Sequence, residues 1–599
     1  MPAPVTPIVS MTAPSPDPRV GLSAGHWDAG QAAWNLKLVS TTPPTEKFVG
    51  VTNSDLAFSG KYVIQGNYNG FQVFDVSNPV KPVMVMGYVC PASQSDVSVY
   101  KNLLFVSGEG LTGRVDCGIQ GVPDPVSKDR LRGIRIFDIS DIAHPKNVAN
   151  VQTCRGSHTH TVVTDPNDKE NIYIYVSGSS QVRSADELPG CVNAGIEDPN
   201  TALFRLEVIK VPLAAPEKAA ITSSPRIFQN LAPPPRNPER DAAGARGAGP
   251  GGAAAGGAPG APDAPGAAAG GVAAGGAAPG AGRGGGGGRG APSQCHDITV
   301  YPDVGLAGGA CGGYGLLLDI REAAYPIRID AAADANMAFW HSATFSNDGK
   351  RILFSDEWGG GTQPRCRDTD KLEWGADSLF AIENNKMVFK SYYKMPAAQT
   401  SFENCVAHNG SMIPIPGREV MAQGWYQGGI SVFDWTDLSH PKEIAYFDRG
   451  PINNTRLITG GSWSVYWYNG LLYSSEIARG LDIFELLPSG LVTENEIDAA
   501  KTVQIDYLNA QQQRKFVWPP SFALARAYMD QLERSKGLTA TRIAAVRTAL
   551  GRAEQASGAQ RSAVLTGLGA GLNTDAARST DREKVRLLSQ TVTALAKAR

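Results

Sequence analysis

One pattern recurs along the chain and constrains its fold more than any other feature. It is a strand of alternating apolar residues that ends in a turn rich in Asp, Ser and Pro, as in GIRIFDISDIAHPK. Copies of the pattern begin at Gly70, Gly133, Gly315, Gly429 and Gly480. The alternation is typical of a strand inside a sheet, and the Asp and Pro residues favour a tight turn after it. A supersecondary unit that repeats in this way predicts a repeat architecture.

A second set of segments aligns by its spacing to these turns and supplies seven candidate innermost strands. The segments begin at Ser54, Ser95, His160, His296, His341, His408 and Trp463. Seven such units predict an all-β fold, a seven-bladed β-propeller over residues 53–490, with a small C-terminal helical appendage. In residues 1–52, the stretch WNLKLVSTTPP near Trp34 is expected to close the ring as the outer strand of the last blade. Closure would remove an open sheet edge.

The FDVSNPVKP-type turns, seen in GFQVFDVSNPVKP from Gly70, resemble those of the LVIVD-repeat family of bacterial surface or exported propellers. The resemblance covers roughly residues 50–490 and implies the propeller fold. It implies no reaction, because the activities of that family are poorly defined. Function must therefore be argued from the site.

Two segments fall outside the propeller pattern. Residues 232–293 are almost wholly Gly, Ala and Pro, a composition that predicts a disordered loop inserted between blades three and four. Residues 500–599 change to helical spacing, with Leu524, Tyr528 and Leu532 on one stripe. We expect three or four short helices there, with a packing role.

The histidines form the strongest candidate site. The first position of the seven inner strands carries Asp55, Asp96, His160, His296, His341, His408 and Trp463, in that order. Side chains at the same end of the inner strands converge on one mouth of the central channel. Four imidazoles at that mouth predict a transition-metal centre for iron, copper or zinc, with ligands His160, His296, His341 and His408. Alternatively, these side chains turn into the packing between blades and are buried core residues.

Other polar residues align near the same mouth. His158 is a candidate fifth ligand or a partner of a ligand. The carboxylates expected to orient the imidazoles are Asp55, Asp96, Asp297, Glu357 and Glu403. His144 and His440 precede Pro and Lys in turns and are expected to be turn residues, and His26 has no evident partner.

The arrangement of histidines resembles that of the carotenoid-cleaving oxygenases, which are seven-bladed propellers that hold ferrous iron with four histidines from separate blades. In outline it is also similar to the selenium-binding methanethiol oxidases, which are propellers associated with copper. Neither family's other motifs occur in this chain, so neither resemblance implies a substrate.

The eight cysteines favour disulfides, because they are even in number and none falls in a CxxC pair. They are Cys90, Cys117, Cys154, Cys191, Cys295, Cys311, Cys366 and Cys405, and all lie near strand junctions on the histidine face. Cys295 and Cys311 bracket one hairpin and are expected to face each other, and a Cys117–Cys191 bond would tie the long loops of blades two and three. The remaining connectivity stays open.

A thiolate metal ligand at Cys90 or Cys154 is the alternative, and it would need a reducing setting. Disulfides instead indicate a secreted, periplasmic or cell-surface protein. The N-terminal stretch MPAPVTPIVSMTAPSPDPRVGL lacks a basic start and an apolar core, so a signal peptide is not visible in this chain.

Charge and hydropathy exclude some partners. The chain has 55 basic and 57 acidic residues, a formal net charge of −2, which gives no reason to expect a nucleic-acid partner. No apolar run reaches the roughly 18 residues that a transmembrane segment needs. The expected partner is a small molecule or a surface ligand, and the oligomeric state is not set by the sequence.

Two function hypotheses follow. The first is an exported propeller whose four-histidine metal centre makes it an oxidoreductase or a lyase acting on a small molecule. The second is a cell-surface binding or adhesion propeller without catalytic activity. The chain has no GxSxG motif and no phosphate-binding glycine loop, which argues against a serine hydrolase or a kinase.

Overall fold

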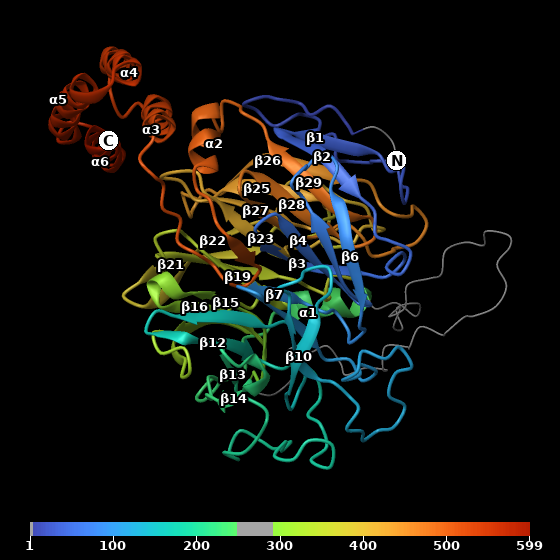
Figure 1. Ribbon diagram of the computed structural model, residues 1–599. Helices are drawn as coiled ribbons and strands as arrows, with labels where there is room; N and C mark the ends of the chain where they lie inside the picture. The colour runs from blue at the N-terminus through green and yellow to red at the C-terminus, as the bar shows by residue number, and fades with distance from the viewer. Residues whose placement is uncertain (1–3, 248–291, 599) are drawn as a thin grey trace.

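The computed structural model describes residues 4–247 and 292–598, and short antiparallel sheets make up most of it (Figure 1). Four of the sheets have four strands each. The first is β7 (Val97–Tyr100), β8 (Leu103–Gly108), β9 (Gly133–Asp138) and β10 (Lys146–Gln152), and the second is β11 (Thr161–Asp165), β12 (Asp168–Val176), β13 (Glu207–Pro212) and β14 (Ala220–Ser223). The third is β15 (Cys295–Tyr301), β16 (Leu306–Cys311), β17 (Tyr314–Asp319) and β18 (Ile327–Ala332), and the fourth is β19 (Trp340–Phe345), β20 (Arg351–Asp356), β21 (Asp377–Glu383) and β22 (Lys386–Tyr393).

Two further sheets complete the β structure of the described residues. One contains β3 (Asn53–Ser59), β4 (Tyr62–Asn67), β5 (Gly70–Asp75) and β6 (Val83–Val89), and β30 (Tyr507–Asn509) extends it beyond β3. The other has nine strands, in the order β1 (Gln31–Trp34), β26 (Lys442–Arg449), β25 (Ile430–Asp434), β24 (Val420–Gly424), β23 (Asn409–Ile413), β27 (Ser462–Tyr468), β28 (Leu471–Glu476), β29 (Gly480–Leu486) and β2 (Leu36–Thr42). Within it, two antiparallel units meet at a short parallel pairing of β23 with β27.

The repeated strands are apolar on both faces because each sheet lies between two others. In β9, Ile136 packs in a buried cluster with Ile172 of the following sheet. Phe137 points the other way and contacts Phe71 of the preceding sheet, with ring centroids 5.5 Å apart. Successive residues of the alternating pattern therefore contact opposite neighbouring sheets.

Buried clusters of this kind join each four-stranded unit to the next. The last unit also packs against the first, because Tyr466 and Ile483 share a cluster with Leu56 and Phe58 of β3. The units consequently form a closed ring, and the chain folds as a β-propeller.

The N-terminal segment contributes to two neighbouring units. β2 pairs with β29, with Leu36 opposite Leu486, as the outermost strand of its unit. β1 pairs with β26, with Gln31 opposite Arg449, in the adjacent unit. Asn35 joins the two strands in the left-handed region, at φ 52°, which Asn tolerates better than most residues.

The helices of the described residues lie mostly after the last repeat. They are α1 (Pro238–Gly247), α2 (Glu494–Lys501), α3 (Phe522–Arg534), α4 (Ala540–Gln555), α5 (Gly558–Ala576) and α6 (Arg582–Lys597), with short 3₁₀ turns at Pro216–Lys218 and Pro302–Val304. Helix α1 falls inside the stretch 232–293 that we expected to be disordered. Arg240 on that helix is buried and donates to the carbonyl oxygens of Ala335 and Met337. The rest of that prediction, residues 248–291, lies outside the described residues.

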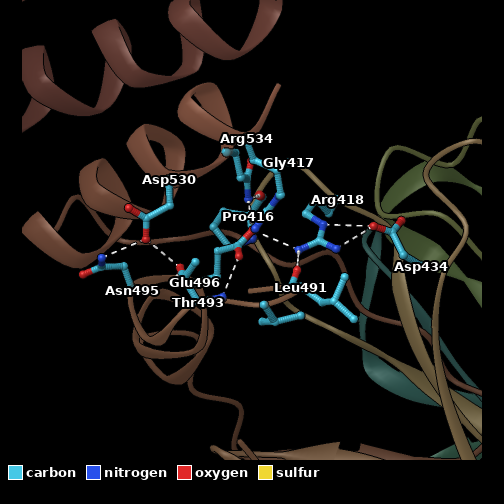
Figure 2. Close-up of polar contacts among 12 residues, drawn as sticks. Pro416, Gly417, Arg418, Asp434, Leu491, Thr493, Asn495, Glu496, Asp530 and Arg534 are labelled. Atoms are coloured by element: carbon cyan, nitrogen blue, oxygen red, sulfur yellow. Dashed lines mark hydrogen bonds and ion pairs between the residues drawn. The ribbon is translucent and has the colours of Figure 1, made fainter. Parts of the chain in front are cut away.

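Helices α3 to α6 share one apolar core and lie to one side of the sheets (Figure 1). Figure 2 shows how they are joined to the propeller through Glu496 of α2. This carboxylate accepts from Arg418 of the propeller at 3.0 Å and from Arg534 of α3 at 2.7 Å. Among the described helices, none is both long enough and apolar enough to cross a bilayer.

Candidate metal centre

Four imidazoles lie in a continuous row at one end of the inner strands. The ring centroids of His158 and His296 are 4.6 Å apart, those of His296 and His341 are 4.0 Å apart, and those of His341 and His408 are 4.1 Å apart. His296 lies in β15 and His341 in β19, and His408 directly precedes β23. Three of the four predicted ligands are therefore neighbours, and His158 takes the fourth place in the row.

Glu357 lies beside two members of the row. Its carboxylate oxygens are 3.7 Å from Nε2 of His341 and 3.7 Å from Nε2 of His408. Ligand atoms of His296, His341 and Glu357 all lie within 4.8 Å of one another. Tyr426 donates its hydroxyl to Glu357 Oε1 at 2.6 Å. The centre thus combines imidazole nitrogens with one carboxylate.

Acceptors next to the row hold three of the imidazoles at Nδ1. His296 Nδ1 lies 2.9 Å from Asp297 Oδ1, and His158 Nδ1 lies 2.5 Å from Glu109 Oε1. His408 Nδ1 donates to the backbone carbonyl of Trp463. A ring that donates from Nδ1 carries its lone pair on Nε2, which is the usual tautomer of a metal-binding histidine.

Two members of the row, His341 and His408, are buried, and burial favours their neutral form. Burial lowers the pKa of His341 well below the ordinary value, and the neighbouring imidazoles lower it further. Burial also lowers the pKa of His408, against the opposing charge of Glu357. Neutral imidazole is the form that binds a metal ion.

His160 does not lie in the row. It is 1% exposed, its Nδ1 is hydrogen-bonded to Ser107 Oγ at 2.8 Å, and burial lowers its pKa to about 3. Its nearest carboxylate is Asp96, at 3.6 Å from Nδ1. The structure therefore brings together His296, His341 and His408, and it places His160 in a separate polar contact.

The five predicted carboxylates differ in what they contact. Glu357 and Asp297 contact the row. Asp55 accepts from Tyr466 at 2.7 Å and from the Asn409 amide at 2.8 Å, and burial raises its pKa to about 6.

Asp96 is fully buried, and burial together with the charges of Asp55 and Asp297 raises its pKa well above the ordinary value. Glu403 accepts from the backbone N–H of Thr400, and none of its hydrogen bonds in the described part of the chain reaches an imidazole.

Sequence reasoning missed Glu109 and Tyr426. Glu109 directly follows β8 (Leu103–Gly108), just as Glu357 directly follows β20 (Arg351–Asp356). Aligning the ends of the second strands would therefore have found it. Tyr426 lies between β24 and β25, in the corresponding connection of its own unit, but a tyrosine two residues beyond the strand end is not a usual metal ligand and carried no signal of that kind.

Four disulfides staple this face of the propeller, as the cysteine count predicted. Cys295–Cys311 crosses its hairpin, in agreement with the expected pair. The expected Cys117–Cys191 bond is wrong, because Cys117 pairs with Cys90 and Cys191 with Cys154. The fourth bond is Cys366–Cys405.

The positions of the paired cysteines in the fold explain the corrected pairs. The Cys90–Cys117 and Cys154–Cys191 bonds each tie a residue before an inner strand to the loop after the second strand of the same unit. Cys366–Cys405 instead ties the loop after β20 to the segment before β23 of the next unit. Four disulfides fit an extracellular or periplasmic protein.

Comparison with known proteins agrees with this architecture. The family model described as the LVIVD repeat matches residues 52–89, the stretch that contains β3 to β6, so the chain carries an LVIVD repeat. No curated protein matches the chain.

Several solved propeller-like structures are similar to the chain at low identity. The periplasmic gluconolactonase of Pseudomonas aeruginosa is 10% identical, with a TM-score of 0.39 over 71% of this chain and 89% of that one. A protein from Lactobacillus plantarum is 11% identical, with a TM-score of 0.36 over 66% and 82%. The computationally designed Ika8 protein is 8% identical, with a TM-score of 0.34 over 74% and 100%. The function of the site is therefore argued from its own geometry.

Proposed function

We propose that this protein is an exported metalloprotein, a seven-bladed LVIVD-repeat propeller whose imidazole row binds iron, copper or zinc. The observation that carries the proposal is the row itself, in which adjacent ring centroids lie 4.0–4.6 Å apart and Glu357 contacts two of the rings. Imidazoles gathered so closely disfavour protonation, since each added proton would repel the next, and neutral imidazole is the form that binds a metal ion.

The donor set fits a transition metal. Imidazole with a carboxylate suits iron, copper and zinc, whereas calcium and magnesium prefer oxygen ligands alone. Nε2 of His408 and Nδ1 of His341 are buried and have no hydrogen-bond partner among the described residues. Buried polar nitrogens without partners are costly, and a bound ion would remove that cost at His408.

We further propose that the centre serves an oxidoreductase that acts on a small molecule. A bound iron or copper ion would supply one-electron chemistry at this position. Tyr426 and Glu357 would hold and move a proton between the phenol oxygen and Oε1, which are 2.6 Å apart. Tyr426 adopts φ 52°, a conformation that costs about 1–2 kcal/mol for a residue other than Gly, which supports a functional constraint on its position.

Metal analysis of a His296→Ala, His341→Ala double variant tests the proposal. The matched control is His144→Ala, His440→Ala, because both of these histidines are exposed turn residues paired with Asp at i−3. We expect wild type and control to retain one equivalent of metal after dialysis and the row variant to retain none. Elemental analysis by mass spectrometry gives both identity and stoichiometry.

The alternative function, a surface-binding or adhesion propeller, predicts a different result. In that case wild type purified and reconstituted with iron, copper and zinc in turn would retain none of them, and the row variant would bind the same surfaces as wild type. Equal metal content in the row variant and the control would also exclude the imidazole row as the centre.

A further inference from the structure

The segment after α2 returns to the propeller and crosses the ends of four inner strands. β30 pairs with β3, with Asn509 opposite Ala57. The Asn509 side chain exchanges two hydrogen bonds with the backbone of Val99 in β7, at 2.7 and 2.9 Å. Val300 in β15 donates to Gln511 O and accepts from Gln513 N. Residues from the C-terminal part of the chain therefore bind strands of several different units.

Two glutamines of this segment differ in what their side chains contact. Gln513 exchanges two hydrogen bonds with the backbone of Phe345 in β19, at 2.8 and 2.7 Å. Gln511 is 2% exposed, and its Nε2 donates to Asp297 Oδ2 at 3.2 Å. Its Oε1 has no partner among the described residues. Gln513 thus fastens a strand, whereas the Gln511 amide is directed to a carboxylate.

That carboxylate contacts the imidazole row. Asp297 is fully buried, and its other oxygen, Oδ1, lies 2.9 Å from His296 Nδ1. The two oxygens of Asp297 therefore link Gln511, on one side, to His296, on the other. In the described part of the chain no Lys or Arg forms an ion pair with Asp297.

We propose that Gln511 is a positioning residue of the metal centre, which fixes the Asp297 carboxylate and thereby the orientation of the His296 ring. This inference rests on the proposed function. Besides His296, the Asp297 carboxylate has Gln511 and the Thr159 hydroxyl as partners. Loss of the Gln511 amide leaves the carboxylate freer to rotate about its Cβ–Cγ bond, and the imidazole that donates to it is then less firmly directed. Partners of metal ligands commonly change metal affinity by about 10–100-fold, and a residue one step further out should act at the lower end of that range.

The variants Gln511→Met and Gln513→Met provide a matched pair. Each keeps the side-chain volume and removes the amide, but only the first removes the contact with Asp297. We expect Gln511→Met to weaken cobalt(II) binding about 10-fold and to change the visible absorption of the bound cobalt. Gln513→Met should leave both unchanged, although it loses two hydrogen bonds to the backbone. Gln511→Asn, which keeps an amide that is one methylene too short, should behave like Gln511→Met.

Unchanged cobalt affinity and spectrum in Gln511→Met would overturn the proposal, and so would equal losses in the two Met variants. A second measurement needs no metal. In metal-free protein labelled with ¹⁵N-histidine, NMR should show His296 as a single Nδ1–H tautomer in wild type and in Gln513→Met, and as a mixture in Gln511→Met.

The two measurements separate the two proposals. If wild type bound no metal, the proposed function would fall, whereas a tautomer change confined to Gln511→Met would still support the positioning role. If metal bound but the tautomer of His296 were the same in all proteins, the positioning role alone would be wrong.

Discussion

Two buried glutamates of this protein have opposite surroundings. Glu496, where the C-terminal helices join the propeller, is fully buried and accepts from Arg418 and Arg534 (Figure 2). It also accepts from the Gln531 amide. Glu357, beside the imidazole row, accepts from Tyr426 and has two histidine nitrogens at 3.7 Å. No Lys or Arg forms an ion pair with Glu357 within the residues that the structure describes.

The difference teaches how to tell a structural buried charge from a binding group. Burial alone would raise the pKa of Glu496, but the charges of Arg418 and Arg534 outweigh it and the pKa is lowered. Side chains of the protein itself therefore neutralise the Glu496 carboxylate. Glu357 lacks such a counter-charge, and buried nitrogens without partners lie near it. This contrast is the reason for proposing that a bound ion supplies the missing partner of Glu357.

The largest effect on unfolding free energy is expected at Glu496, whose charge is neutralised by arginines of the protein. Glu496→Ala leaves Arg534 without its carboxylate and Arg418 with only that of Asp434, and breaking a buried pair from one side costs about 3–5 kcal/mol. Urea denaturation should show this loss of unfolding free energy, with metal content unchanged. Glu494→Ala, on the exposed side of the same helix, is the control and should change stability by less than about 0.5 kcal/mol. Loss of metal in Glu496→Ala would show that Glu496 also supports the metal centre, and the two glutamates would then not differ in role as stated.

The reverse result, with stability retained and metal affinity reduced, is expected at Glu357. Glu357→Gln keeps the shape of the side chain and removes a buried charge that has no Lys or Arg partner among the described residues. Unfolding free energy of the metal-free protein should stay within about 1 kcal/mol of wild type or rise, while metal affinity falls about 100-fold. Competition with a chromophoric chelator measures the affinity. A destabilisation as large as that of Glu496→Ala would show that Glu357 is a structural residue as well.

The sequence predicted the strands that are fixed by local pattern. β5, β9, β17 and β25 coincide with the repeated segments, because each buries both faces against neighbours and alternation records that burial. β30 was not predicted. Its three residues have no alternation of their own, and they form a strand only because β3 lies beside them.

The same distinction applies to the site. Alignment of inner strands brought His296, His341 and His408 into one register, and the structure has them side by side, with His296 and His341 inside strands and His408 directly before β23. His158 and His160 both precede β11, in a connection where Gly156 has φ 71° and the two-residue period does not hold. Which of the two histidines joins the row is decided by that turn, together with Glu109 from another loop.

The last effect appears only in acid, where the two sites should lose stability in different pH ranges. Burial lowers the pKa of His341 and His408 from the ordinary 6.5, so below that pH these two side chains bind more protons in the unfolded chain and their contribution to the unfolding free energy of metal-free protein falls. The pKa of Glu496 is lowered from 4.5, so its contribution is complete above about pH 4.5 and is lost as the pH falls through the folded-state pKa. Urea titrations between pH 7.5 and 3 should show that Glu496→Gln is less stable than wild type above pH 4.5 and approaches it below. The slope between pH 6.5 and 5 should be the same in both proteins, since the groups that set it, the buried imidazoles and buried carboxylates with a raised pKa such as Asp55, are present in both. A change of that slope in Glu496→Gln would mean that Glu496 and the imidazole row are coupled. The contrast between Glu496, which the protein neutralises, and Glu357, which has no Lys or Arg partner among the described residues, would then not hold.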